Sequence, residues 1–173
     1  MTEDSYKIRL ARADELRDVQ DIENAAAYLF SDTDYSFVIA FEPIDFDFLA
    51  ARQKENQIWV AVDIEDKVVG FAVVRIVDDA AYIHELDVHP SHGRRGLGRR
   101  LIFAVREWAK SAGLSAMTLS TFRDIEWNAP FYARLGFRVL TEKELTPGLI
   151  EVRRKEAEVG LPLDKRVCMR MEF

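Results

Sequence analysis

The chain has 173 residues, 49% hydrophobic and 31% charged, a balance typical of a globular protein with one core. Its net charge of −6, from 24 basic and 30 acidic residues, disfavours nucleic-acid and membrane-surface binding, because such proteins are usually basic. The single cysteine, Cys168, excludes an internal disulfide. Because the charged N-terminal stretch also lacks the apolar core of a signal peptide, we expect one cytoplasmic domain over residues 1–173.

Apolar periodicity predicts the elements of the first half of the chain. In chain order they are a strand over residues 7–12, a helix over 13–30, an irregular acidic and aromatic connection over 31–47, a helix over about 45–55, a hairpin of strands 57–63 and 67–77, and a strand over 82–88.

The stretch from Ile83 to Leu101 is the most informative part of the sequence. Glycines at 93, 96 and 98 allow a tight turn in which successive backbone N–H groups point toward one anion. The helix that begins near Leu97 adds its unpaired N–H groups and positive dipole end. Cationic side chains are supplied by Arg94, Arg95, Arg99 and Arg100. The stretch predicts a phosphate site; a solvated basic helix start is the alternative.

The second half continues with the same kinds of signal. The expected elements are the helix from Leu97, closed by Gly113; a strand over 116–121; a helix with Asn128 as N-cap, closed by Gly136; a strand over 137–140; a helix over 148–159 with Thr146 as N-cap, closed by Gly160; and a strand over 166–172.

The glycine spacing in the phosphate loop is neither that of dinucleotide-binding folds nor that of nucleoside-triphosphate loops. A strand–loop–helix with [Q/R]-x-x-G-x-[G/A] instead resembles the GNAT superfamily of acetyl-CoA-dependent N-acetyltransferases. Gly93 departs from the usual Gln or Arg, and Arg94 is expected to replace the lost charge. Asn128 to Phe137, NAPFYARLGF, is similar to the family's second signature. The resemblance implies an α+β fold: a three-layer α/β/α sandwich with a mixed, mostly antiparallel sheet of about seven strands and a central bulge or splay.

The same resemblance implies acetyl-CoA as cosubstrate, with direct attack by an amine and no acyl-enzyme. Pantetheine would insert between strands 82–88 and 116–121 and pair with the backbone of Leu86 and Val88, and an N–H of Leu86 or Asp87 would face the thioester carbonyl. The expected pyrophosphate and further cofactor contacts are Gly93, Arg94, Arg95, Gly96, Leu97, Gly98, Arg99, Asn128 and Phe131. Cys168 is then a core residue rather than a nucleophile.

By family position, Tyr132 is the expected acid that protonates the leaving thiolate; a packed core aromatic is the alternative. An alkyl ammonium has a pKa of about 10, so a base must remove its proton. Glu85 is the first candidate and His84 the second, with water also open; both side chains also suit a purely structural polar role. The spacing of His84, His89 and His92 matches no standard zinc arrangement, so no metal is expected.

The acceptor pocket is expected at the acidic, aromatic connection over 31–47, with the segment over 141–163 as a further wall. Acidic and aromatic groups favour a cationic small amine over a peptide N-terminus or lysine, while carboxylates that merely solvate a loop are the alternative. A coenzyme A-binding module without catalysis and a nucleic-acid binder are the rival functions. Acyl groups other than acetyl stay open, as does a homodimer.

Overall fold

A computed structural model describes residues 5–173, whose elements follow the predicted order. The strands are β1 (Lys7–Leu10), β2 (Ile58–Val62), β3 (Val68–Val77), β4 (Ala80–Val88), β5 (Ala116–Phe122), β6 (Arg138–Val139) and β7 (Arg166–Glu172). The α-helices are α1 (Leu16–Ala27), α2 (Phe46–Lys54), α3 (Leu97–Ser111), α4 (Ala129–Arg134) and α5 (Pro147–Glu158). Short 3-10 helices are η2 (Ala13–Glu15), η3 (Tyr28–Phe30), η4 (Ser36–Ala40), η5 (Pro90–His92), η6 (Glu142–Glu144) and η7 (Leu163–Lys165).

The seven strands form the predicted mixed sheet, in the order β1-β2-β3-β4-β5-β7-β6. The β1–β2, β2–β3, β5–β7 and β6–β7 pairs are antiparallel, whereas β4 and β5 are parallel. The register of the parallel pair covers Ala80–Tyr82 against Ala116–Thr118, at the beginning of both strands. A register shift between Ala61 and Val62 makes an irregularity in β2.

The chain divides into two compact units that interleave along the sequence. Unit 1 comprises the described residues up to Val74 together with Glu85–Val105, and unit 2 comprises Arg75–His84 and Arg106–Phe173. The strands β3 and β4 and the helix α3 therefore each contribute residues to both units. The single domain expected over residues 1–173 stays a prediction.

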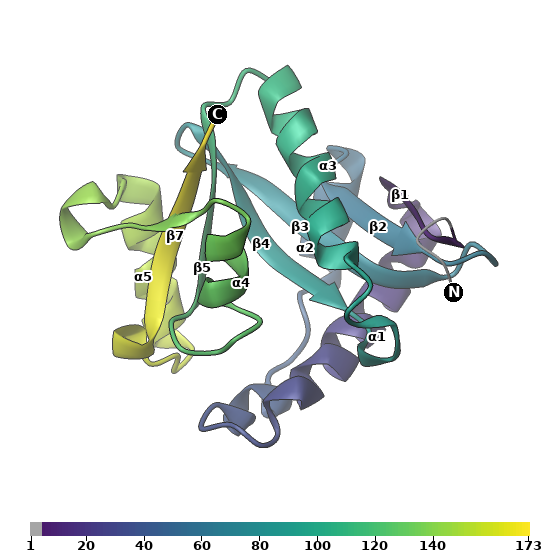
Figure 1. The fold of residues 1–173 in the computed structure, drawn as a ribbon, viewed down its shortest axis with the longest axis horizontal. Coiled ribbons are helices and arrows are strands. Elements are labelled where there is room, and N and C mark those ends of the chain that lie inside the picture. Colours follow the sequence, from purple (N-terminus) through teal and green to yellow (C-terminus); the bar gives the residue numbers. More distant parts are fainter. Residues whose placement is uncertain (1–4) are drawn as a thin grey trace. The chain divides into compact units, whose positions relative to one another are not determined.

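Unit 1 is built on β1–β3, with α1 and α2 on one face and the first turns of α3 on the other (Figure 1). On the α1–α2 face, alternate residues of β2 and β3 meet Leu16, Val19 and Ile22 of α1 and Leu49 of α2. All five residues of β2 are buried, so both of its faces are covered. That double coverage explains why its sequence, IWVAV, is a continuous apolar run.

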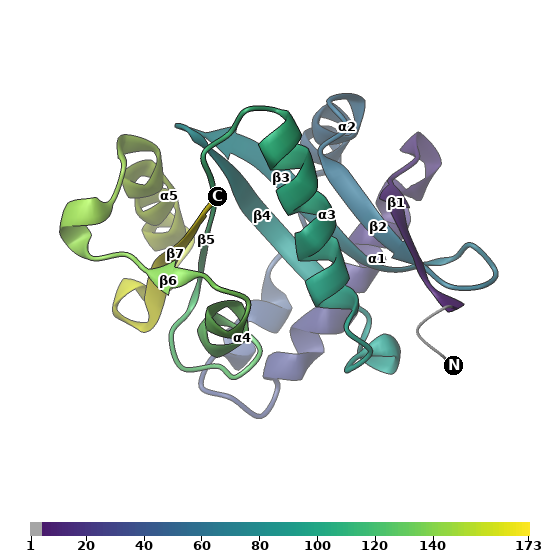
Figure 2. The same ribbon diagram turned by 45° about the horizontal axis from the view of Figure 1, so that its top comes forward.

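Unit 2 is built on β5, β7 and β6, with α4 and α5 on opposite faces of these strands (Figure 2). Leu149 and Val152 of α5 pack with Tyr82 and Cys168 in one buried cluster. Met171 alternates to the other face of β7 and lies beside Gly136, at the end of α4. Both faces of β7 are thus covered by helices of the same unit.

Three predicted elements are clearly shorter in the structure. The strand expected over 7–12 ends at Leu10. The helix expected over 13–30 is α-helical only over Leu16–Ala27, because both of its ends are 3-10 helices, η2 and η3; at η2, Arg12 N donates to Glu15 Oε2 at 2.7 Å. The strand expected over 137–140 shrinks to Arg138–Val139, because Phe137 N still donates to Tyr132 O of α4 at 3.1 Å. Among residues 5–173, no helix has both the length and the apolar character needed to cross a membrane.

Candidate active site

The predicted phosphate loop follows β4 in unit 1 and enters α3 through η5. His89 N donates to Val69 O at 2.8 Å, which ties the start of the loop to β3. The N–H groups of His92 and Gly93 turn back to His89 O and Pro90 O, at 2.8 and 3.3 Å. The N–H of Gly93 is therefore used within the turn, and the N–H groups suited to an anion are those that follow it, up to the first turn of α3.

Gly96 is the position where the loop requires glycine. Its φ of +73° is left-handed, and a Cβ built there would meet nothing within 4 Å, so the loop is open on that side. Gly93, by contrast, has φ −64° and ψ 163°, a conformation that any residue adopts. Arg94 carries a positive φ of 58°, unusual for a residue with a side chain. Backbone geometry therefore permits the Gln or Arg usual at position 93, while it fixes glycine at 96.

The four arginines around the loop divide into two groups. Arg94, Arg95 and Arg99 are exposed. Arg100 is half-buried, and its Nη2 donates to Tyr6 O at 2.9 Å. Three of the predicted cationic side chains are thus exposed, and their contact with phosphate stays a prediction, whereas Arg100 fastens α3 to the chain ahead of β1.

His92 also connects the loop to the N-terminal part of unit 1. Its Nδ1 lies 2.9 Å from the hydroxyl of Tyr6, and the two rings meet edge-to-face. Burial, followed by the nearby Arg95, lowers the pKa of His92 and favours the neutral ring. The His92 side chain therefore attaches the loop to Tyr6.

Within residues 5–173, no group of three or more His, Cys, Asp or Glu side chains is arranged to hold a metal ion.

The end of β4 is pressed against β3 at Gly70. A Cβ at Gly70 would stand 3.1 Å from Asp87 O and 3.2 Å from Val88 Cγ2, closer than ordinary van der Waals contact. Glycine at position 70 therefore sets how the backbone of Asp87 and Val88 lies, and these are two of the predicted cofactor-pairing residues. Sequence reasoning did not single out Gly70, because a glycine within a strand signals close approach without naming its partner.

A pair of carboxylates, Glu23 of α1 and Asp87 of β4, is the main feature that sequence reasoning missed. Both side chains are half-buried. Burial raises the pKa of each, and the repulsion of Glu23 raises the pKa of Asp87 further. Glu23 Oε2 also accepts a hydrogen bond from Ile44 N at 2.8 Å, which fixes its position. The pair can hold a proton near neutral pH and attracts a positive charge.

The predicted base candidates lie next to Asp87 in β4. His84 and Glu85 are both half-buried. The His84 ring meets Tyr82 edge-to-face at a centroid distance of 6.4 Å. Their catalytic roles stay predictions, as does the backbone pairing of Leu86 and Val88 with pantetheine.

Tyr132 lies in α4 of unit 2 and is 8% exposed. Its ring meets Phe131 and Phe137 edge-to-face, at centroid distances of 5.1 and 5.7 Å. Asn128 stands at the N-cap position, but within residues 5–173 its side chain makes no hydrogen bond to the first turn of α4. Instead its Oδ1 accepts from Phe122 N at 3.4 Å, because the backbone of Asn128 is not in the conformation of a capping residue. The predicted side-chain cap is therefore wrong, and Asn128 ties α4 to the end of β5.

Cys168 is 2% exposed in β7, and burial raises the pKa of its thiol. A buried thiol of raised pKa is a poor nucleophile, which agrees with the core role predicted for it.

The connection between α1 and α2 has two kinds of side chain with different roles. Tyr35, Phe37 and Phe41 form an aromatic cluster, with centroid distances of 6.5 and 5.9 Å between successive rings. Its acidic side chains are all exposed, namely Asp32, Asp34, Glu42, Asp45 and Asp47. Asp45 caps α2 by accepting from Phe48 N at 2.9 Å. These exposed carboxylates match the alternative in which they only solvate the loop. The half-buried carboxylate that contacts this connection is Glu23 of α1, through its hydrogen bond with Ile44 N.

The strand order, the short parallel register and the glycine loop at the start of α3 define an acetyltransferase fold. Residues 16–137 match the model of the acetyltransferase (GNAT) family. The chain belongs to this family, and it is an acyltransferase.

Solved structures with the same fold are distant in sequence. PaiA N-acetyltransferase from Thermoplasma acidophilum, in complex with coenzyme A, is 15% identical with a TM-score of 0.70, over 98% of this chain and 99% of that one. Ribosomal-protein-S18-alanine N-acetyltransferase from Escherichia coli is 20% identical with a TM-score of 0.66, over 96% and 93%. N-acetylglutamate synthase from Neisseria gonorrhoeae, with coenzyme A and N-acetyl-glutamate, is 16% identical with a TM-score of 0.71, over 96% of this chain and 35% of that one.

Proposed function

We propose that the chain transfers the acetyl group of acetyl-CoA directly to a primary amine, and that the amine is a small cationic molecule. The glycine loop supports the cosubstrate, since Gly96 leaves its open side to an approaching phosphate beside exposed Arg94, Arg95 and Arg99. The coenzyme A complexes of PaiA N-acetyltransferase and N-acetylglutamate synthase support it further, because those structures share this fold.

The observation that carries the choice of acceptor is the pair formed by Glu23 and Asp87. Two half-buried carboxylates whose pKa values are raised by burial gain most from a partner that brings positive charge. An ammonium ion supplies that charge, and a neutral acceptor does not. The aromatic cluster of Tyr35, Phe37 and Phe41 in the same unit offers a surface for the body of a small organic cation.

The proposed reaction removes protons from the acceptor amine and gives one proton to the leaving thiolate. The Asp87 carboxylate takes the proton from the ammonium. Its raised pKa brings its proton affinity closer to that of an amine, which makes it a stronger base than an ordinary carboxylate. The amine nitrogen then forms a bond to the acetyl carbonyl carbon, the carbon–sulfur bond breaks, and Tyr132 gives its phenolic proton to the departing thiolate. The nitrogen loses its second proton in the same step, and that proton restores the phenol of Tyr132. Glu85 and His84 are the alternative bases, and an N–H of Leu86 or Asp87 would stabilise the oxyanion.

The remaining parts of the proposal concern the chain as a whole. We expect a single catalytic domain in the cytoplasm, supported by one buried cysteine, and a homodimer is compatible with an edge strand, β6, of two residues. Acetyl transfer to a peptide N-terminus or lysine is the competing activity within the enzyme class.

A coupled assay of coenzyme A release tests the proposal. Acetyl-CoA is incubated with diamines, polyamines, aminoglycosides, amino acids and peptides, and the free thiol is measured with a colour reagent. We expect release with cationic small amines, weaker release in Glu23→Gln, and loss of release in Asp87→Asn. Release only with peptides would overturn the acceptor assignment and leave acetyl transfer standing. Tight acetyl-CoA binding with no release from any acceptor would favour a non-catalytic coenzyme A-binding module.

A further inference from the structure

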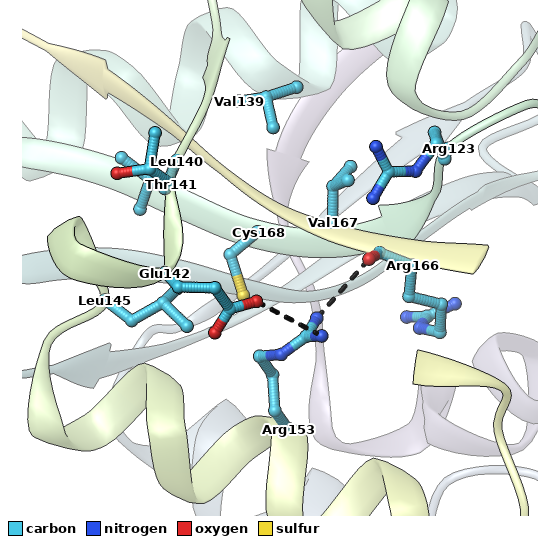
Figure 3. Close-up of a pocket in the computed structure, with 10 residues that line it drawn as sticks. All are labelled: Arg123, Val139, Leu140, Thr141, Glu142, Leu145, Arg153, Arg166, Val167 and Cys168. Atoms are coloured by element: carbon cyan, nitrogen blue, oxygen red, sulfur yellow. Dashed lines mark hydrogen bonds and ion pairs between the residues drawn. The ribbon is translucent and has the colours of Figure 1, made fainter. Parts of the chain in front are cut away.

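Unit 2 contains a cavity of about 290 Å³ beside β7, bounded by the chain that follows β6 and by α5 (Figure 3). Among the residues singled out from the sequence, the cavity includes Cys168, which was given no functional role. Part of the lining falls in the segment over 141–163 that was expected as a further wall of the acceptor pocket. The residues proposed to hold acetyl-CoA are not among those that line the cavity, and neither are Glu23 and Asp87. The proposed acetyl transfer therefore gives no role to the charged side chains of this cavity.

The lining of the cavity combines positive charge with an apolar wall. Three arginines line it, Arg123, Arg153 and Arg166. Within residues 5–173, the single carboxylate of the lining is Glu142, whose side chain is 84% exposed and therefore well solvated. The apolar part on the side of Arg153 is supplied by Leu140 and Leu145, which pack with Cys168 and α5 in one cluster, whereas the side chains of Val139 and Val167 point to the other side of β7 (Figure 3). This composition suits a ligand with one anionic group and a hydrocarbon body.

Arg153 is the arginine best placed to grip an anion. Its side chain is 16% exposed and reaches from α5 toward β7 (Figure 3). Its Nη1 and Nη2 donate to Arg166 O and Leu163 O at 3.4 and 3.3 Å, and Nη2 lies 3.9 Å from Glu142 Oε1. These contacts are long for a guanidinium, whose hydrogen bonds to carboxylates are typically about 2.7–2.9 Å. With five N–H donors, Arg153 has capacity for a shorter, two-point contact.

Arg166 has a different role in the same lining. Its Nη2 bonds Glu156 Oε1 at 3.0 Å and Ser120 O at 3.1 Å, and both side chains of the ion pair are almost fully buried. Because Glu156 already neutralises this guanidinium, Arg166 is part of the cavity wall and does not bind the anionic group of a ligand. The charge presented to a ligand is then that of Arg153, with exposed Arg123 at the edge.

We propose that this cavity binds a small aliphatic carboxylate, with its carboxylate group on Arg153 and its hydrocarbon against Leu140 and Leu145. A volume of about 290 Å³ is at the lower end for ligand sites, which limits the ligand to about the size of an amino acid. A carboxylate suits the planar guanidinium fork, and Glu142 already directs its own carboxylate at this position from the rim. Glu142 then acts as an internal competitor for Arg153.

The full chain with carbon-13-labelled methyl groups is titrated with 4-methylpentanoate and followed by NMR. We expect saturable shifts of the Leu140 and Leu145 methyl signals. The uncharged isostere 4-methylpentanamide and inorganic phosphate should bind at least about tenfold more weakly, because each lacks one half of the recognition. Equal binding of the amide, or no shift of these methyl groups with the acid, would overturn the proposal.

Three variants separate a specific site from general attraction. Arg153→Gln should weaken 4-methylpentanoate binding by about tenfold to a hundredfold, since a charge-assisted contact is lost. Arg154→Gln is the matched control on the same helix, because Arg154 is exposed and paired with Glu151 and Glu158, and it should leave the affinity unchanged. Glu142→Gln should strengthen binding severalfold, and it decides the question if Arg153→Gln does not fold. An unchanged or weaker affinity in Glu142→Gln contradicts the proposed position of the carboxylate.

Discussion

Tyr6 and His92 are 86 positions apart in the chain, yet the Tyr6 hydroxyl lies 2.9 Å from His92 Nδ1. Arg100 adds a second connection at the same point, from its guanidinium to Tyr6 O at 2.9 Å. The loop that is expected to hold pyrophosphate is thereby fastened at both of its ends to a buried residue outside it. Such preorganisation lowers the entropy lost when a ligand binds.

Tyr6→Phe should raise the dissociation constant of coenzyme A by about three- to tenfold, because the loop loses one hydrogen bond of about 1 kcal/mol. Isothermal titration calorimetry measures the affinity. The control is Tyr28→Phe, an exposed tyrosine on η3 that should bind coenzyme A like the unmodified chain. If both variants bind normally, the Tyr6 contact does not organise the loop.

Gly96→Ala should destabilise the fold by about 1 kcal/mol and also weaken coenzyme A binding, because alanine is strained at a φ of +73° and its methyl group enters the open side of the loop. Gly160→Ala is a close control: its φ is +88°, and a Cβ there also meets nothing within 4 Å. Both variants should lose stability in thermal unfolding, whereas only Gly96→Ala should lose affinity. If the two variants bind coenzyme A with equal affinity, position 96 does not lie against the phosphates of coenzyme A.

Tyr132→Phe should lower kcat by about a hundredfold or more while leaving the coenzyme A dissociation constant within about twofold, because the ring still packs and only the proton donor is lost. Steady-state kinetics with an active amine provide the comparison. Tyr82→Phe, another buried tyrosine of unit 2, controls for removal of a hydroxyl. An unchanged kcat in Tyr132→Phe would leave this residue a packing role only.

The stability of the chain should fall as pH rises from about 4.5 through neutrality, and Glu23→Gln should flatten that fall. Burial raises the pKa of Glu23 in the folded chain, so the folded state binds this proton more tightly than the unfolded state does. The stabilisation is therefore present below the unfolded pKa and is lost as pH rises through the folded pKa. Denaturant unfolding at pH 5, 7 and 8.5 measures it; parallel curves for the two proteins would contradict the assignment.

The same substitution should move the pH–rate profile. Because the Glu23 carboxylate raises the pKa of Asp87, its removal should let Asp87 lose its proton at a lower pH. The rising limb of kcat/KM should then shift to lower pH in Glu23→Gln. An unshifted limb would point to Glu85, His84 or water as the base.

Local signals explain which parts of the molecule could be predicted. The bounds of β7 and the ends of α3 and α4 follow from alternation and from glycines at 113 and 136, which adopt positive φ. The loop between β4 and α3 was equally accessible, because its glycines, proline and arginines lie within one short stretch; its binding of phosphate stays a prediction.

The partners of buried polar groups could not be predicted, because they depend on how distant elements pack. Asp87 was predicted through its backbone, but nothing local shows that its side chain shares a site with Glu23 on α1. Asn128 occupies the expected N-cap position, yet its side chain bonds Phe122 N, since the backbone conformation of a cap is a property of the folded loop. The arginine-lined cavity joins α5, β7 and the residues after β5 and β6, which no local pattern connects.

The interleaving of the two units along the chain limits how the protein can be divided. Neither unit is one continuous stretch, so no single break in the polypeptide releases either of them whole. A fragment starting at Arg106 would lack residues 75–84, and β5 would lose the parallel partner supplied by Ala80–Tyr82. Truncation and fragment complementation are therefore poor ways to assign activity to one unit, and point substitutions in the full-length polypeptide are the appropriate tool.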